Sequence, residues 1–180
     1  MKAAPVSVRV RLMRAIVLVL LVSAPSLASP GQTRTVTTVI LVRHAERETG
    51  QGDDPLSAQG RVRAQALAYV LRDADIRTVM TSGVTRTRET AEPFARQAGL
   101  TPEVLPSDKL DAITERIRSL SGSAVLIVHH SNTVPVIAEK LGAKIEPIAD
   151  QEFDRLIVMT ISPTGSPSVV TLRYGPPPVR

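Results

Sequence analysis

All three histidines of this 180-residue chain stand just beyond the end of an apolar run. His44 follows residues 39–42 after one intervening residue, and His129 and His130 directly follow residues 124–128. Short continuous apolar runs are typical of strands that are buried on both faces. Histidines that were merely solvated would not be expected to gather at such places. Their positions therefore indicate a site at the end of a sheet.

Arginines accompany these histidines. Arg43 directly precedes His44, and Arg86 and Arg88 follow the apolar stretch 78–81. A guanidinium presents a planar fork of donors that matches phosphate oxygens, and it keeps its charge at ordinary pH. A helix beginning near Asn132 would direct its free amide groups at the same edge. These residue types favour a site for a phosphoryl group.

The chemistry available to such a site is narrow. The chain contains no cysteine, no P-loop and no cluster of aspartates suited to magnesium. A neutral imidazole nitrogen can attack phosphorus in line and form a phosphohistidine, which divides one difficult displacement into two easier ones. His44, with Arg43 beside it, is the candidate nucleophile. A proton donor for the leaving group is also required.

Each residue taken alone also has a structural interpretation. Arg43 or Arg86 by itself is more often a surface cation, and His130 by itself is more often a hydrogen-bonded structural histidine. Glu46 could simply pair with Arg43 or Arg47. The joint placement of these residues at strand ends is what favours a catalytic site over these interpretations.

Strand and helix signals alternate along the chain. Val62, Ala66, Tyr69 and Val70 recur at helical spacing after Ser57, a good N-cap residue. The signals predict strands at 38–42, 78–81, 103–105, 124–128, 155–161 and 168–174, with helices starting at Ser57, in the segment 82–98, at 107–120 and at 132–141. Gly99 would end the second helix, and residues 162–167 would form a hairpin turn.

This alternation predicts an α/β fold, a three-layer α/β/α sandwich with a mainly parallel central sheet. In such sheets ligands bind beyond the carboxyl ends of the strands, where the histidines and arginines stand. The expected organisation is a signal peptide at 1–28, a flexible leader at 29–37, the domain at 38–175 and a frayed tail at 176–180.

The N-terminal segment also accounts for most of the net positive charge. The formal net charge is +5, and residues 1–28 hold four basic residues and no acidic ones; removing these four of 22 leaves 18 basic against 17 acidic residues. With aromatic residues at only 2%, a nucleic-acid partner is not expected. The short apolar core at 15–22 and the small residues before 29 predict a cleaved signal peptide, and thus a periplasmic or secreted protein without stable membrane association. An uncleaved anchor is the alternative.

Four segments together resemble the histidine phosphatases, the phosphoglycerate-mutase-like superfamily, and especially its small bacterial phosphohistidine phosphatases. "LVRHAE" is similar to the Arg-His-Gly/Ala signature, and "TSGVTRTRETAEP" is similar to the Ser-x-x-x-Arg-Thr segment. "DPLSAQGRVRAQAL" and "LIVHHSNTVP" match the remaining two in the family's order. The resemblance implies that His44 is the nucleophile, that His130 is the second catalytic histidine, and that Arg43, His44, Arg86 and His130 bind phosphate without metal or cofactor.

The chain departs from the family pattern in three ways. His129 stands where glycine is usual, so its side chain must point away from the phosphate or narrow the pocket and influence substrate choice. The 152 residues left by 180 minus 28 lack room for the long mutase insertion. No motif identifies the proton donor; Asp108 and Asp111 are the candidates by position, ahead of Glu46 and Glu115.

The resulting expectation is an exported, metal-independent histidine acid phosphatase-like hydrolase of a small phosphorylated substrate. A non-catalytic phospholigand-binding module, a phosphomutase and a zinc protein using the histidines are the alternatives. Zinc is disfavoured because adjacent residues of a strand, such as His129 and His130, point to opposite faces. The sequence leaves the phosphoester and the oligomeric state undecided.

Overall fold

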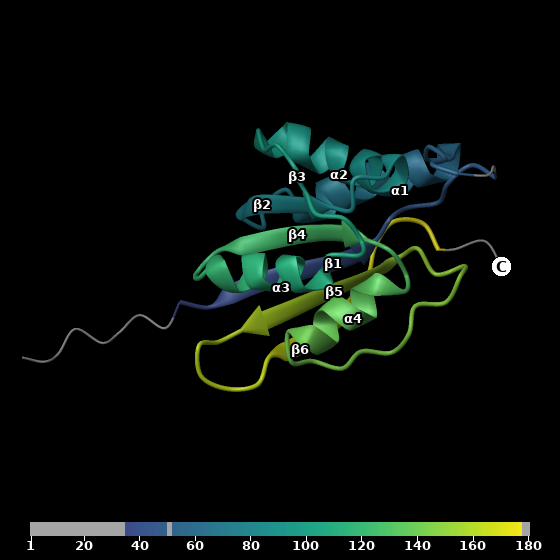
Figure 1. Ribbon diagram of the computed structural model, residues 1–180. Helices are drawn as coiled ribbons and strands as arrows, with labels where there is room; N and C mark the ends of the chain where they lie inside the picture. The colour runs from purple at the N-terminus through teal and green to yellow at the C-terminus, as the bar shows by residue number, and fades with distance from the viewer. Residues whose placement is uncertain (1–34, 50–51, 178–180) are drawn as a thin grey trace, which may run out of the picture. The chain divides into compact units, whose positions relative to one another are not determined.

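The computed structural model describes residues 35–49 and 52–177. Within these residues strands and helices alternate as expected (Figure 1). In chain order the elements are β1 (Thr37–Arg43), α1 (Ala58–Leu71), β2 (Ile76–Thr81), α2 (Thr85–Ala98), β3 (Glu103–Val104), α3 (Leu110–Ser119), β4 (Ala124–His129), α4 (Thr133–Lys140), β5 (Arg155–Ile161) and β6 (Ser168–Arg173). Every predicted strand and helix is present, although α2 and α3 each begin about one turn later than expected.

The strands form one sheet in the order β3-β2-β4-β1-β5-β6. β1 pairs in parallel with β4, and β2 pairs in parallel with both β4 and β3. β5 is antiparallel to β1 and to β6, so it alone runs against the others. The predicted α/β sandwich with a mainly parallel sheet is confirmed. β1 and β4 lie side by side in the middle, which brings the residues after them together.

Helices cover both faces of the sheet. α1 and α2 pack on one face, where Ile40 and Val42 of β1 contact them, and α3 and α4 pack on the other, where Val39 and Leu41 do (Figure 1). Alternate residues of a strand point to opposite faces, so a strand covered on both sides must be apolar throughout. This explains the uninterrupted apolar runs of β1 and β4.

Two local signals in the sequence act as predicted. The Ser57 hydroxyl accepts a hydrogen bond from the Gly60 amide and caps α1. α2 ends at Gly99, whose φ of 67° is the left-handed conformation that glycine adopts without steric cost. Ser57 thus sets the start of α1, and Gly99 sets the end of α2.

The apolar spacing that predicts α1 does not mark its buried face. Val62, Tyr69 and Val70 are exposed, at 58%, 68% and 51%. The helix instead buries small residues, two leucines and one arginine, namely Gly60, Arg63, Ala64, Leu67, Ala68 and Leu71. Small residues allow α1 to approach α2 and the turn after β1 closely, and this favours burial of the other face of the helix.

The predicted limits of the domain fall close to the observed elements. Thr37, counted with the leader, begins β1, and Tyr174 after β6 is buried. The predicted signal peptide and the last three residues lie outside the described part of the chain. Over 35–49 and 52–177, no helix has the length and apolar character needed to cross a membrane.

Candidate active site

His44 lies immediately after β1 and is only 5% exposed. Its amide donates to the carbonyl of His129 (2.8 Å), which holds the chain against the end of β4. Its Nδ1 lies 2.8 Å from the carbonyl oxygen of Ala45. Because a carbonyl only accepts hydrogen bonds, the hydrogen of the neutral imidazole must be on Nδ1. Nε2 therefore carries the free lone pair.

Arg86 in the first turn of α2 lies against this lone pair. Its Nε donates to His44 Nε2 over 3.3 Å. Asp53 lies 4.0 Å from the same guanidinium and accepts from the amide (2.6 Å) and the hydroxyl (2.8 Å) of Thr85, which lowers the pKa of Asp53. Asp53 thus caps the N-terminal end of α2 from another segment of the chain. This contact fixes the position of the first turn of α2, from which the Arg86 side chain extends.

His130 approaches His44 from the end of β4. The two rings meet edge to face, with centroids 5.4 Å apart. The Thr87 hydroxyl donates its hydrogen to the Val84 carbonyl (2.8 Å), so it can only accept from Ser82 Oγ (3.1 Å). Because the Ser82 hydrogen is used in this way, Ser82 Oγ accepts from His130 Nε2 (2.9 Å). This chain of donors places the hydrogen of neutral His130 on Nε2. Nδ1 is then the nitrogen that can gain a proton.

Both imidazoles are uncharged at neutral pH. Burial, with smaller contributions from Arg43, His130 and Arg86, lowers the pKa of His44 to about 3. Burial, followed by the charges of the neighbouring groups, lowers the pKa of His130 to about 4. The charges of the arginines contribute to keeping His44 neutral, but desolvation is the larger cause. A neutral His44 is the form that can act as a nucleophile.

Arg43, the last residue of β1, is held by a loop far along the chain. Its Nη1 donates to the carbonyls of Ala149 (2.9 Å) and Asp150 (2.7 Å), and its guanidinium carbon lies 4.0 Å from the centre of the Phe153 ring. Its Nε is buried and has no hydrogen-bond partner in the described part of the chain. The guanidinium is thus oriented by backbone oxygens and keeps a donor that they do not use.

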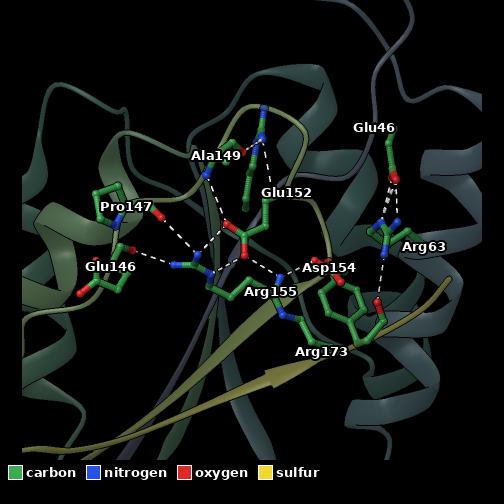
Figure 2. A network of polar contacts seen from close by, with 11 residues as sticks. Glu46, Arg63, Glu146, Pro147, Ala149, Glu152, Asp154, Arg155 and Arg173 are labelled. Carbon is green, nitrogen blue, oxygen red and sulfur yellow. Dashed lines mark hydrogen bonds and ion pairs between the residues drawn. The ribbon is translucent and has the colours of Figure 1, made fainter. Parts of the chain in front are cut away.

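A network of ion pairs shapes this loop (Figure 2). Arg155 donates to the carbonyls of Glu146 (2.7 Å) and Pro147 (3.1 Å) and to the carboxylate of Glu152 (2.6 and 2.9 Å). Glu152 also accepts from the Ala149 amide (3.2 Å). Arg155 is the first residue of β5, so the sheet itself determines where the carbonyls that bind Arg43 lie.

The turn after His44 is held by both helices of its face. The Ala45 amide donates to Thr90 Oγ1 of α2 (2.9 Å), and the Glu46 carbonyl accepts from the Ser57 amide (2.9 Å) before α1. A Cβ at Gly60 would collide with that Glu46 carbonyl, so only glycine fits there. The carbonyl that orients His44 therefore belongs to a turn with little freedom to move.

Glu46 pairs with Arg63, not with Arg43 or Arg47. Arg63 is fully buried on α1; its Nε and Nη2 donate to the Glu46 carboxylate at 2.6–3.0 Å, and its Nη1 donates to the Tyr174 carbonyl at 2.9 Å (Figure 2). A partner seventeen residues along the chain explains why the local interpretation failed. Glu46 has a structural contact and is not free to act as a proton donor.

The predicted phosphate-binding residues surround one cavity of about 700 Å³. Asp108 is also in its wall, whereas Asp111 is not: the Asp111 carboxylate faces away on α3, 2.7 Å from Lys140 Nζ. The lining residues are Arg43, His44, Arg47, Gly52, Arg86, Ser107, Asp108, His130, Ser131, Asn132 and Thr133. The fold thus joins the ends of β1 and β4 with the starts of α2 and α4.

His129 points away from this cavity, which is the first of the two alternatives raised for it. Its side chain is 1% exposed, with Nδ1 2.6 Å from Thr133 Oγ1 and Nε2 3.5 Å from the Leu105 carbonyl. It packs between α4 and the segment after β3 and does not narrow the cavity. Among the residues that the structure describes, no three His, Asp or Glu side chains gather as metal ligands would.

Sequence reasoning missed three contributors to the site. Arg47 and Ser107 line the cavity, and the loop 146–153 supplies the carbonyls and the Phe153 ring that hold Arg43. Arg47 directly follows the recognised "LVRHAE" stretch and so could have been noticed. The loop carries no strand, helix or catalytic pattern, and its contribution is mostly backbone, so no side-chain signal could reveal it.

The two low histidine pKa values predict a loss of stability in acid. Below pH 6.5 the unfolded chain takes up protons that folded His44 accepts only near pH 3, so the free energy of unfolding falls as pH falls. We expect the melting temperature to drop between about pH 7.5 and about pH 4.5, and the drop to be smaller in His44→Gln. An equal drop in both proteins would contradict the low pKa.

Residues 39–107 match the family model of the histidine phosphatase superfamily (branch 1). This range includes Arg43, His44 and Arg86 and ends before His130. A probable phosphoglycerate mutase GpmB of Escherichia coli O1:K1 is 27% identical over 135 residues, covering 62% of this chain and 63% of the relative. The chain therefore spans less than two thirds of the length of the curated relatives it matches.

Solved structures share the fold. The protein histidine phosphatase SixA in complex with tungstate superimposes with a TM-score of 0.65 at 19% identity, covering 76% of this chain and 96% of SixA. The α-ribazole phosphatase of Shigella flexneri superimposes with a TM-score of 0.63 at 15% identity and the same coverage. The strand order and the residues gathered around His44 agree with these likenesses: the chain has the fold of these compact phosphatases, and its residues 39–107 match the histidine phosphatase superfamily.

Proposed function

We propose that this protein is a phosphatase that hydrolyses a phosphomonoester through a phosphohistidine formed on His44. One observation carries the proposal. The Ala45 carbonyl holds the hydrogen of His44 on Nδ1, which leaves the lone pair of Nε2 facing the Arg86 guanidinium in the cavity. An uncharged imidazole whose nucleophilic nitrogen already lies beside a phosphate-binding cation is arranged for in-line attack.

The steps follow from this geometry. A phosphate dianion entering the cavity would accept from the Arg86 Nε that the free protein directs at His44, and Arg43 would bind a further oxygen. His44 Nε2 then forms the N–P bond as the ester oxygen departs. The dianion also favours a proton on His130, since negative charge raises the pKa of a nearby imidazole. Water finally hydrolyses the phosphohistidine and regenerates neutral His44.

Two arginines and a protonated His130 could neutralise the phosphoryl group in the way a metal ion does elsewhere, so we propose a metal-independent reaction. The test is turnover of p-nitrophenyl phosphate by the purified protein with and without a strong chelator. Equal turnover supports the proposal. Loss of turnover with the chelator, restored by added metal, argues for a metallophosphatase, and binding of phosphate without any turnover argues for a binding module.

Asp108 is the proposed proton donor, because it lines the cavity whereas Asp111 does not. Asp108→Asn should lower kcat for an alkyl phosphate by about 10- to 100-fold, since an alkoxide leaves only with a proton. It should change kcat for p-nitrophenyl phosphate little, because that leaving group needs no proton. Asp111→Asn is the matched control and should change neither. An equal loss on both esters would reject Asp108 as the donor.

Mutase activity is the second candidate, favoured by the E. coli relative that carries that name. A mutase returns the phosphoryl group to the substrate, so it would convert one phosphate isomer into another faster than it releases inorganic phosphate.

We also propose export, on the basic and apolar pattern of residues 1–28. Cell fractionation with N-terminal sequencing of the recovered protein tests it, and a cytoplasmic protein retaining residue 1 would reject it.

A further inference from the structure

The charge around the cavity limits the kind of ester it can accept. Both imidazoles are neutral in the free protein, as their pKa values of about 3 and about 4 require. Arg47 forms an ion pair with Asp54, whose side chain is only 12% exposed, so that its charge is already compensated. Among the residues that line the cavity, Arg43 and Arg86 are then the guanidinium groups left for a ligand.

One phosphate dianion uses both of these charges. Arg43, Arg86 and the His130 that the dianion protonates all serve this one phosphoryl group, and within the described lining no further cation lies free for a second anionic group. A second anion would thus lose water without gaining a partner, which is costly in a partly enclosed site.

Apart from Arg47 and Asp108, the rest of the wall is polar but uncharged. Beyond the phosphate-binding corner it presents Ser107, Ser131, Asn132 and Thr133, and no aliphatic or aromatic hydrocarbon side chain of the described residues lines it. Asn132 stands at the start of α4 and makes no capping hydrogen bond there, so its amide is available to a ligand. A volume of about 700 Å³ is far larger than a phosphate group and is typical of small-molecule sites.

We infer that the substrate is a phosphomonoester whose leaving group is an uncharged, hydroxyl-bearing alcohol such as a sugar or polyol. The inference rests on the proposed function and adds a substrate class to it. Hydroxyl groups can both donate to and accept from the amide and hydroxyls of the wall. A hydrocarbon leaving group would bury those polar atoms without partners, and an anionic one would lack a cation.

Two pairs of esters that differ by one carboxylate test this inference. We expect kcat/KM for glycerol 3-phosphate to exceed that for 3-phosphoglycerate by at least about tenfold, and glucose 6-phosphate to exceed 6-phosphogluconate similarly, since tenfold corresponds to about 1.4 kcal/mol. Equal or faster turnover of the carboxylate esters would overturn it. Turnover of p-nitrophenyl phosphate, measured alongside, reports the proposed function separately.

A variant can weaken the preference. Asn132→Arg adds a cation to the wall and should reduce the preference for glycerol 3-phosphate severalfold, while Gln97→Arg adds the same charge on the exposed end of α2, outside this cavity, and should leave it unchanged. Equal effects of the two variants would contradict a local charge limit. If no ester is hydrolysed, the dissociation constants of the same pairs for His44→Ala decide the inference, because binding needs no chemistry.

Discussion

Replacement of His44 by alanine is expected to lower kcat for p-nitrophenyl phosphate by about a thousandfold or more, because removal of a covalent nucleophile typically has at least this effect. The reason is structural: the lone pair of His44 Nε2 lies 3.3 Å from Arg86 Nε, beside the group that would bind the phosphate. His130 is held by Ser82 through Nε2, and its Nδ1 lone pair takes up the proton that a bound dianion favours, so it does not replace His44.

A second experiment with the same variant can identify the intermediate. Rapid quenching of the unaltered protein with labelled substrate should trap one phosphoryl group that is stable in alkali and labile in acid, as a phosphohistidine is, and His44→Ala should trap none. Added imidazole should restore part of the turnover of the variant, since the small molecule can occupy the vacated space. A melting curve close to that of the unaltered protein excludes unfolding as the cause. Undiminished turnover in His44→Ala would reject the mechanism.

The sequence was most informative where structure and chemistry depend on the same short segment. The apolar runs of β1 and β4 had to be buried on both faces, which made the sheet and the strand ends predictable. Once these strands were identified, Arg43, His44 and His130 followed, because parallel neighbours end at the same edge. Arg86 was predictable for the same reason, as it stands in the first turn of the helix after β2.

What the sequence could not reveal depends on contacts between distant segments. The buried face of α1 could not be found from apolar spacing, because α1 turns three apolar side chains to solvent and buries an arginine. The carbonyls around Arg43 belong to a loop more than a hundred residues away. From their sequence positions alone, Asp108 and Asp111 were equally good candidates for the proton donor. Only the structure separates them, because Asp108 lines the cavity whereas Asp111 points toward Lys140.

The second large effect is expected at that buried arginine. Arg63→Met should lower the free energy of unfolding by about 3–5 kcal/mol, because it leaves the Glu46 carboxylate, 12% exposed, without its partner. Arg116 and Glu103 offer a matched control: the same forked contact at 2.7 and 2.8 Å, but with side chains 39% and 36% exposed. Arg116→Met should cost less than about 1 kcal/mol, as exposed ion pairs contribute little. Denaturant titration measures both.

The position of this ion pair makes a further effect on catalysis predictable. Glu46 is two residues from His44, and the intervening Ala45 carbonyl keeps the imidazole in its reactive tautomer. At a temperature where Arg63→Met is fully folded, we expect kcat to fall about tenfold with KM nearly unchanged, because phosphate binding by Arg43 and Arg86 is intact while the nucleophile is less well oriented. Adding Glu46→Leu to Arg63→Met should recover stability, since it removes the unpaired carboxylate, but should not recover kcat. Recovery of both together would show that the pair serves stability alone and that other contacts hold the turn.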